Sequence, residues 1–251
     1  MTWKTAITRI EPGQIRLRGY DITELMGRLS FAETVFLTLK GERPKPAEAR
    51  MMEALLVSSV DHAATPPSSQ AARLILSGGN PLNAAVAAGV LTIGDSHGGA
   101  IEQCAQVLQE RAAQAGDVDE IAKGLVEELR AEKKRLAGYG HRLHQVDPRS
   151  TRLYELASEV GFGGRHMELA RAVENALEAI TGRAMPLNVD GAIAAVISDM
   201  GFDWRLGKGF FIIARTVGLV AHAFEEWSRE KPMRRFIVDD SEYDGPADRS
   251  L

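Results

Sequence analysis

The segment 208–228 constrains the fold more than any other part of the sequence, because its residues are apolar around most of the helix that it would form. Such a helix is stable only when other elements cover it. The sequence therefore predicts a buried central helix with further helices around it. Arg215 lies in the middle of this segment. A charged group in such surroundings must be paired or must bind an anion.

Most of the remaining chain carries the same helical period. Ser30 and Glu33 form a capping-box pattern, Gly41 ends that helix after Lys40, and Asp21 has the spacing of a similar helix start. Apolar residues recur at helical spacing in five further stretches, namely Met52, Leu55, Leu56 and Val60; Ile121, Leu125, Leu129 and Leu136; Leu153, Leu156, Ala157 and Val160; Leu169, Val173, Leu177 and Ile180; and Val189, Ile193, Val196, Ile197 and Met200.

Only the first 20 residues alternate with the period of a strand. Ile7 and Ile10, then Ile15 and Leu17, flank the turn signal Pro12-Gly13, which predicts a small β-hairpin. No strand pattern recurs, so we expect no parallel α/β sheet. The predicted fold class is mostly α, in one compact unit over 1–251. We expect residues 1–20 to form the hairpin, 21–238 a helical core, and 239–251 a polar tail that is poorly ordered.

The charge and cysteine content exclude several classes of protein. Lys plus Arg is 30 and Asp plus Glu is 34, a net charge of 30 − 34 = −4, which argues against a nucleic-acid partner. The single cysteine, Cys104, excludes a disulfide framework and a multi-cysteine metal site, and no His-Glu-x-x-His pattern indicates a metal. Met1–Lys4 begins no signal peptide, so we expect a cytoplasmic protein. Asn83 and Arg215 interrupt the longest apolar stretches, so we expect no membrane-spanning helix.

Two histidines lie in glycine-rich segments at predicted helix starts. His97 stands in Gly94-Asp-Ser-His97-Gly-Gly-Ala100, where a helix dipole disfavours the cationic imidazole and leaves it able to donate to a developing enolate oxygen. The alternative is a glycine turn with an incidental histidine. His141 stands in Gly138-Tyr-Gly-His141-Arg142, where glycines permit close approach to a ligand. The alternative there is a basic turn that faces solvent.

Further charged residues accompany these histidines. Asp147 can cap a helix with Pro148 at its first position, which brings His141, Arg142 and Arg149 near one helix start. Asp190 follows Asn188 in the first turn of an apolar helix, where helix electrostatics alone would explain it. Neutral histidine, carboxylate and arginine together suit chemistry at the carbon next to a carbonyl, in which a carboxylate moves the proton and arginines hold carboxylates.

The order of these motifs resembles the citrate synthase superfamily over nearly the whole chain. Seven segments match the family in sequence order. They are Arg18–Leu25, the Asp61-His62 region with Ser68, Ser69 and Arg73, the small-residue turn Ser77–Pro81, Gly94–Glu102 with Gly138–Arg149, and Asn188–Asp190 with Ala214–Gly218. The resemblance implies a citrate-synthase-like multi-helix fold and a homodimer or higher homo-oligomer.

The resemblance also implies roles for the residues. His97 would stabilise the enol of an acetyl-CoA thioester, Asp190 would move the proton of its methyl group, and His141 would polarise the keto group of oxaloacetate. The oxaloacetate carboxylates would be held by His62, Arg149 and Arg215, with Arg234 or Arg235 reaching a partner subunit's site. The CoA ester, a substrate and not a bound cofactor, would contact the segment that contains Gly138, Tyr139, Gly140 and Arg142.

Three departures resemble citryl-CoA lyase and the C-terminal module of ATP-citrate lyase more than full-length citrate synthases. The link between Gly41 and Asp61 is short, and Ile101 and Gly191 stand where synthases usually have Asn and Phe. His97 is retained, although animal ATP-citrate lyase has an aromatic residue there. We therefore expect an enzyme that makes or breaks the carbon–carbon bond of citryl-CoA. The alternatives are a complete citrate or 2-methylcitrate synthase and a non-catalytic relative that binds CoA esters.

Overall fold

A small antiparallel sheet begins the chain. The computed structural model describes residues 2–140, 146–234 and 242–250. Strands β1 (Thr8–Glu11) and β2 (Gln14–Leu17) pair with Ile10 opposite Ile15, so the predicted hairpin is confirmed. A third strand, β3 (Tyr20–Asp21), pairs with β2 and escaped the sequence analysis, because two residues are too few to show an alternating pattern.

The regular elements in the rest of the described chain are helices, so the predicted mostly α class is confirmed. The helices are α1 (Ile22–Leu25), α2 (Phe31–Lys40), α3 (Pro46–Ser58), α4 (Pro67–Ser77), α5 (Leu82–Leu91), α6 (Ala100–Ala112), α7 (Val118–Ala131), α8 (Pro148–Glu159), α9 (Arg165–Thr181), α10 (Val189–Asp199) and α11 (Gly207–Arg229), with a 3₁₀ turn at Trp204–Leu206 before α11. The spacing of Leu136 predicted that it lies on the same helix as Leu129, but α7 ends at Ala131 and Leu136 follows it. The Leu136 side chain is nevertheless buried in the core.

Several helix ends follow from local sequence signals. Ser30 accepts from the Glu33 amide at 3.2 Å, Glu33 accepts from the Ser30 amide at 2.8 Å, and Gly41 ends α2 with a φ of 91°. Asp147 caps α8 by accepting from the Arg149 amide at 3.0 Å. These caps satisfy amides that would otherwise lack partners, and they fix where the two helices begin.

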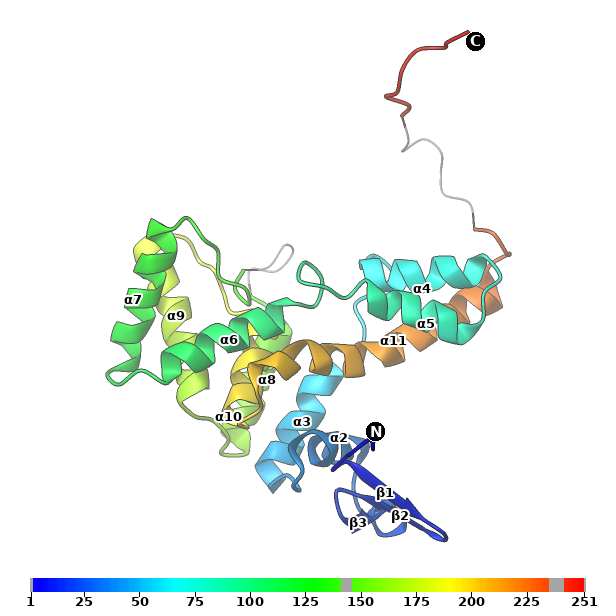
Figure 1. The fold of residues 1–251 in the computed structure, drawn as a ribbon. Coiled ribbons are helices and arrows are strands. Elements are labelled where there is room, and N and C mark those ends of the chain that lie inside the picture. Colours follow the sequence, from blue (N-terminus) through cyan, green and yellow to red (C-terminus); the bar gives the residue numbers. More distant parts are fainter. Residues whose placement is uncertain (1, 141–145, 235–241, 251) are drawn as a thin grey trace.

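Helix α11 extends from the group of helices that contains α6, α8 and α10 to the pair α4 and α5 (Figure 1). Its first half packs on α6 and α3, while α4 and α5 lie against its second half. Helices α6 to α10 pack with one another beside the first half, and the β-hairpin lies with α2 on another side. The main hydrophobic core therefore surrounds the first half of α11, and includes Phe210 and Phe211.

The prediction that the 208–228 segment forms a buried helix holds for one face of α11 in the single chain. One face, which includes Arg215 and His222, is buried, whereas Val217, Phe224 and Trp227 are 59%, 63% and 70% exposed. The sequence analysis assumed that Arg215 excludes a membrane-spanning helix, but by length and composition the stretch Trp204–Arg229 could cross a membrane. The core helix of a folded domain meets the same criteria, and 44% of the most apolar 18 residues of this stretch is buried.

Two helical glycines provide a test of this packing. A Cβ on Gly89 of α5 would lie 2.8 Å from Leu219 Cδ1 and 2.9 Å from the Ser68 carbonyl oxygen, whereas a Cβ on Gly124 of α7 would meet nothing within 4 Å. We predict that Gly89→Ala destabilises the protein by about 1–3 kcal/mol through overpacking. Gly124→Ala should stabilise it by about 0.5–1 kcal/mol, because alanine loses less backbone entropy. Thermal unfolding of both variants checks this, and a stabilising Gly89→Ala would contradict the close helix contact.

Candidate active site

A cavity of about 690 Å³ collects predicted site residues from five separate parts of the chain. His62, His97, Arg149, Asp190 and Arg215 all line it. Its other lining residues are Thr65, Pro66, Pro67, Asp95, Ser96, Gly98, Ala100, Gly140, Asp147, Asn188, Val189 and Phe211. The fold therefore brings together two histidines, an acid and two arginines that lie up to 153 positions apart in the sequence (215 − 62 = 153).

His97 is held by a tight turn just before α6. Backbone hydrogen bonds join Gly94 and His97 in both directions, at 2.9 and 3.0 Å. Gly98 follows with a φ of +82°, and a Cβ there would lie 2.7 Å from the Phe211 ring. The glycine lets Phe211 meet the imidazole edge-to-face, at 5.8 Å between ring centroids. The His97 ring is thus fixed on one side of the cavity.

Ser68 of α4 makes a polar contact with the His97 ring. The Ser68 hydroxyl lies 2.8 Å from His97 Nε2 and is fully buried. Burial and the positive charge of Arg215 both lower the pKa of His97. A neutral imidazole can donate one hydrogen bond to a developing oxyanion, as the sequence analysis proposed for His97.

Asp190 lies in the first turn of α10, beneath an asparagine cap. Asn188 Oδ1 accepts from the amides of Asp190 and Gly191, at 3.0 and 3.2 Å, while Asn188 Nδ2 donates to the Gly140 carbonyl at 2.8 Å. Burial raises the pKa of Asp190, and Asp147 adds to this, whereas Arg149 and Arg215 oppose it. A carboxyl group with a raised pKa is better matched to proton transfer near neutral pH than an ordinary aspartate.

Asp147 joins the starts of α8 and α10 and so holds Arg149 beside Asp190. Its buried carboxylate pairs with the Arg149 guanidinium through Oδ1 at 3.1 Å and Oδ2 at 3.0 Å, and Oδ2 also accepts from the Val189 amide at 3.0 Å. Burial acts to raise the pKa of Asp147, but the Arg149 hydrogen bonds hold it below its usual value. The sequence predicted Asp147 as a helix cap and gave no signal for its link to α10.

Arg215 is 3% exposed and lines the cavity. Its Nε donates to the Ser59 carbonyl at 3.2 Å, and its guanidinium lies 4.6 Å from the centre of the Phe211 ring. Within the described residues it forms no ion pair. Burial lowers the pKa of Arg215, with Arg149 adding to this and Asp61 and Asp190 opposing it. The site therefore holds a buried cation that suits a carboxylate ligand.

Four other predicted site residues occur at positions 141–142 and 234–235 of the sequence. His141, Arg142 and Arg235 lie outside the described residues, so their predicted roles stay predictions. The Arg234 guanidinium pairs with Glu226 at 2.7 Å and Glu230 at 2.8 Å in its own chain.

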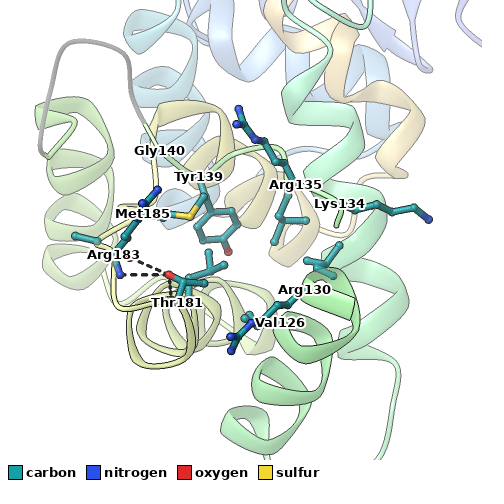
Figure 2. A pocket seen from close by; sticks show the side chains of 13 residues that line it. Val126, Arg130, Lys134, Arg135, Tyr139, Gly140, Thr181, Arg183 and Met185 are labelled. Carbon is teal, nitrogen blue, oxygen red and sulfur yellow. Dashed lines mark hydrogen bonds between the residues drawn. The ribbon is translucent and has the colours of Figure 1, made fainter. Parts of the chain in front are cut away.

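The Gly138–Gly140 segment separates the cavity from a second pocket of about 630 Å³ between α7 and α9. Gly140 lines both pockets, and Tyr139 lines the second, where its hydroxyl donates to the Ala170 carbonyl at 3.0 Å. Gly138 instead packs on α10, since a Cβ there would lie 2.8 Å from Gly191 Cα. Figure 2 shows the apolar Met185 and Tyr139 side chains of the second pocket, with Arg130, Arg135 and Arg183 around them.

Comparison with known proteins assigns the family. The family model described as "Citrate synthase, C-terminal domain" matches residues 29–236. The chain belongs to the citrate synthase family. It is 26% identical over 234 residues to "Citrate synthase 2" of Bacillus subtilis, which covers 91% of this chain and 60% of that protein. The chain thus spans little more than half the length of the curated citrate synthases that it matches.

Two solved structures cover the whole fold. The structure of citryl-CoA lyase from Hydrogenobacter thermophilus superposes with a TM-score of 0.94 at 48% identity, and covers 100% of this chain and 98% of that one. The ATP citrate lyase of Methanothrix soehngenii, in complex with citrate and coenzyme A, superposes at 0.86 and 24% identity, and covers 98% of this chain and 42% of that one. The first neighbour therefore shares the short length of this family member.

The departures from the family pattern have packing reasons. Ile101 is fully buried in the core, where the amide of an asparagine would need buried partners. Gly191 packs directly on the carbonyl oxygen of Gly138, and a Cβ there would also lie 2.5 Å from Leu187 Cδ1. A phenylalanine at position 191 would displace the segment that separates the two pockets.

The raised pKa of Asp190 predicts how stability depends on pH. Between the ordinary aspartate value of 3.8 and the raised value in the folded protein, the folded state binds more protons than the unfolded state. The stability contributed by the protonated Asp190 is therefore lost as pH rises through this window. We predict that Asp190→Asn gains stability relative to the unsubstituted protein as pH rises from 4 to 7, measured by urea unfolding at several pH values. A difference independent of pH would contradict the raised pKa.

Proposed function

We propose that this family member cleaves citryl-CoA into acetyl-CoA and oxaloacetate. The observation that carries the proposal is the cavity that joins His97, Asp190, Arg149 and Arg215. The match over 98% of a citryl-CoA lyase of the same length supports it. The two arginines bind the carboxylates of the oxaloacetate part, because a guanidinium matches a carboxylate in geometry and charge.

The residues share the steps of this cleavage. His141 takes the proton of the citryl hydroxyl group, in keeping with the family resemblance. The carbon–carbon bond then breaks, the hydroxyl carbon becomes the keto carbon of oxaloacetate, and the electron pair passes into the enolate of the acetyl thioester. His97 donates a hydrogen bond to that enolate oxygen. Asp190, which its raised pKa helps to keep protonated, gives its proton to the terminal carbon and so completes acetyl-CoA.

The alternative is the reverse reaction, with hydrolysis of the thioester, as in a complete citrate synthase. The curated citrate synthases in the family favour it, but they are much longer than this chain. A regulatory relative that only binds CoA esters has no need for His97, Asp190 and the arginines in one cavity.

One assay separates these functions. The protein receives citryl-CoA in one reaction, and acetyl-CoA with oxaloacetate in another. We predict acetyl-CoA and oxaloacetate from the first, and no free thiol from the second. Free thiol in the second reaction would indicate the synthase, and no product in either reaction at millimolar substrate would contradict both enzymes.

Removal of the Asp190 carboxyl group tests its role in proton transfer. Asp190→Ala should lower the rate of citryl-CoA cleavage by roughly 10²- to 10⁴-fold, the range that general acid catalysis contributes. The CoA ester should still bind, because other groups hold the nucleotide and the carboxylates. Single-turnover rates and calorimetric titration check the two effects, and an unchanged rate would refute the assignment.

The second pocket is proposed to hold the phosphorylated adenosine end of CoA. Gly140 borders both pockets, so a long thioester can reach from one to the other beside this residue. Lys134, Arg135 and Arg183 are exposed at the second pocket, and within the described residues neither arginine forms an ion pair. Such cations suit the phosphate groups of CoA, and the apolar Met185 suits the adenine ring.

A phosphate-deletion experiment tests this assignment. We predict that Arg183→Ala raises the KM for citryl-CoA by about tenfold, the loss expected for one hydrogen bond to a charged group. With the 3′-dephospho form of the substrate, the same substitution should change KM less than twofold if Arg183 binds the 3′-phosphate. Arg9→Ala, on the distant hairpin, is the control. An equal loss with both substrates would place Arg183 away from that phosphate.

The exposed stripe on α11 is proposed as the interface with a second copy of the chain. Val217, Val220, Phe224 and Trp227 recur at helical spacing, and Leu91 at the end of the neighbouring α5 is 84% exposed. Apolar side chains gathered on adjacent helices mark an association surface. The family resemblance implies that a C-terminal arginine reaches the cavity of the second copy, and Arg235 is the better candidate for that role because Arg234 is engaged in its own chain.

A charge placed in this stripe should separate the copies. We predict that Phe224→Glu lowers the mass measured by light scattering to that of one chain. Val57→Glu is the matched control, because Val57 is 61% exposed, close to the 63% of Phe224, but lies on α3. A monomeric unsubstituted protein, or a Phe224→Glu variant with unchanged mass, would contradict the interface.

We also propose that the protein is located in the cytoplasm, as expected from the sequence. Cys104 is fully buried and is the single cysteine, so the chain needs no oxidising environment for an internal disulfide. Cell fractionation with an antibody against the protein tests this location.

A further inference from the structure

Two buried polar residues on α11 lie outside the cavity. His222 and Glu226 follow Arg215 by seven and eleven residues, a spacing that keeps all three on one face of the helix. His222 is 9% exposed and Glu226 is 2% exposed. Such groups are costly to bury without partners, so their contacts indicate what they do.

Glu226 connects α4 with the C-terminal segment. Its carboxylate accepts from Arg73 Nε at 2.9 Å and from Arg234 Nε at 2.7 Å. Ser77 at the end of α4 holds the same segment, since its carbonyl accepts from the Met233 amide and its hydroxyl from the Arg234 amide. Met233 and Arg234, which follow α11, are thus held against α4, in part through a buried acid.

His222 continues these contacts toward the cavity. Arg73 Nη1 lies 3.0 Å from His222 Nδ1, and His222 Nε2 lies 3.0 Å from Asp61 Oδ1. A guanidinium can only donate, so Nδ1 accepts and the ring proton lies on Nε2, which donates to Asp61. The tautomer of His222 is therefore set by Arg73, and it is the one that can bind the Asp61 carboxylate.

Asp61 closes the turn that carries His62. Its Oδ2 accepts from the Ala63 amide at 3.0 Å, and Ala63 has a φ of 63°, a left-handed conformation that costs energy for a residue with a Cβ. His62, between these two residues, lines the cavity. The conformation of the turn thus depends on a carboxylate whose other oxygen is held by His222.

Two further contacts from α11 hold the same loop. Arg215 Nε donates to the Ser59 carbonyl, and Gly218 lets the loop lie directly on the helix, since a Cβ there would meet the Val60 carbonyl oxygen at 2.5 Å and Asp61 Oδ1 at 2.8 Å. Three successive turns of α11 therefore hold residues 59–61. The contact from His222 is the one that acts on the side chain that shapes the turn.

We propose that His222 is a positioning residue for the substrate site: through Asp61 it fixes the strained turn that presents His62 to a carboxylate of the oxaloacetate part. Arg73, Glu226 and Arg234 extend the same contacts to the C-terminal segment. The identity of the carboxylate ligand rests on the proposed function, whereas the link from His222 to His62 rests on the contacts above.

Paired substitutions test this role. His222→Leu removes both ring nitrogens, whereas His222→Gln keeps an amide that can donate to Asp61 and accept from Arg73. We predict that His222→Leu weakens oxaloacetate binding about tenfold, the loss of one charge-assisted contact, and that His222→Gln restores most of it. Calorimetric titration with oxaloacetate measures this without turnover, and citryl-CoA kinetics should place the effect in KM more than in kcat.

A double-mutant cycle shows whether His222 acts through His62. In a His62→Ala background, His222→Leu should change oxaloacetate affinity less than twofold, because the positioned group is gone. An equal loss in both backgrounds would overturn the proposal. Asp199→Asn is the control for general destabilisation, since Asp199 pairs with His166 at 2.7 Å and caps α9 elsewhere in the fold. It should lower the melting temperature without changing oxaloacetate affinity.

The His62 ring signal in ¹H–¹³C NMR gives a readout that is independent of the proposed function. If the protein binds no oxaloacetate, the ligand assignment fails, but the positioning role still predicts that the His62 signal shifts in His222→Leu and returns in His222→Gln. A His62 signal that is the same in all three proteins would overturn the proposal, whatever the enzyme's substrate.

Discussion

The buried guanidinium of Arg215 is the interaction on which the site depends. It lies on the buried face of α11, with one hydrogen bond to the Ser59 carbonyl and an aromatic ring beside it. A charge so placed is costly unless an anion shares the cavity. The same charge lowers the pKa of His97 and opposes the rise in that of Asp190, so it acts on both groups proposed for the chemistry. The fold thus holds a buried positive charge that the carboxylate of a substrate can pair with.

Glycines and helix caps fix the positions of the site residues around this charge. Gly98 allows Phe211 to approach His97, Gly191 allows the 138–140 segment to lie on α10, and Gly218 allows the His62 loop to lie on α11. Asp147 and Asn188 each cap a helix and also bind a second segment, so Arg149 and Asp190 are placed by the helix starts themselves. Groups held in this way need little reorganisation when the substrate binds.

Much of this was predictable from the sequence, for identifiable reasons. The caps at Ser30 and Asp147 are local signals, and the family resemblance identified six of the lining residues, Gly140 among them. Contacts between distant segments were not predictable from one sequence. Ser68 gives no sign that it meets His97, and the face of α11 left exposed depends on which helices pack against it. His222 and Glu226 carried a usable signal, since their spacing from Arg215 puts three polar groups on one face of an apolar helix.

The most direct test of the account is the effect of oxaloacetate on the thermal stability of Arg215→Met. A ligand that binds the folded state raises the melting temperature, and the unsubstituted protein should show this rise. Without ligand, Arg215→Met should be at least as stable as the unsubstituted protein, because a buried charge has been replaced by an apolar side chain of similar length. Oxaloacetate should then no longer raise its melting temperature. A destabilised Arg215→Met that oxaloacetate still stabilises as strongly as the unsubstituted protein would show that Arg215 is structural, and would contradict the account.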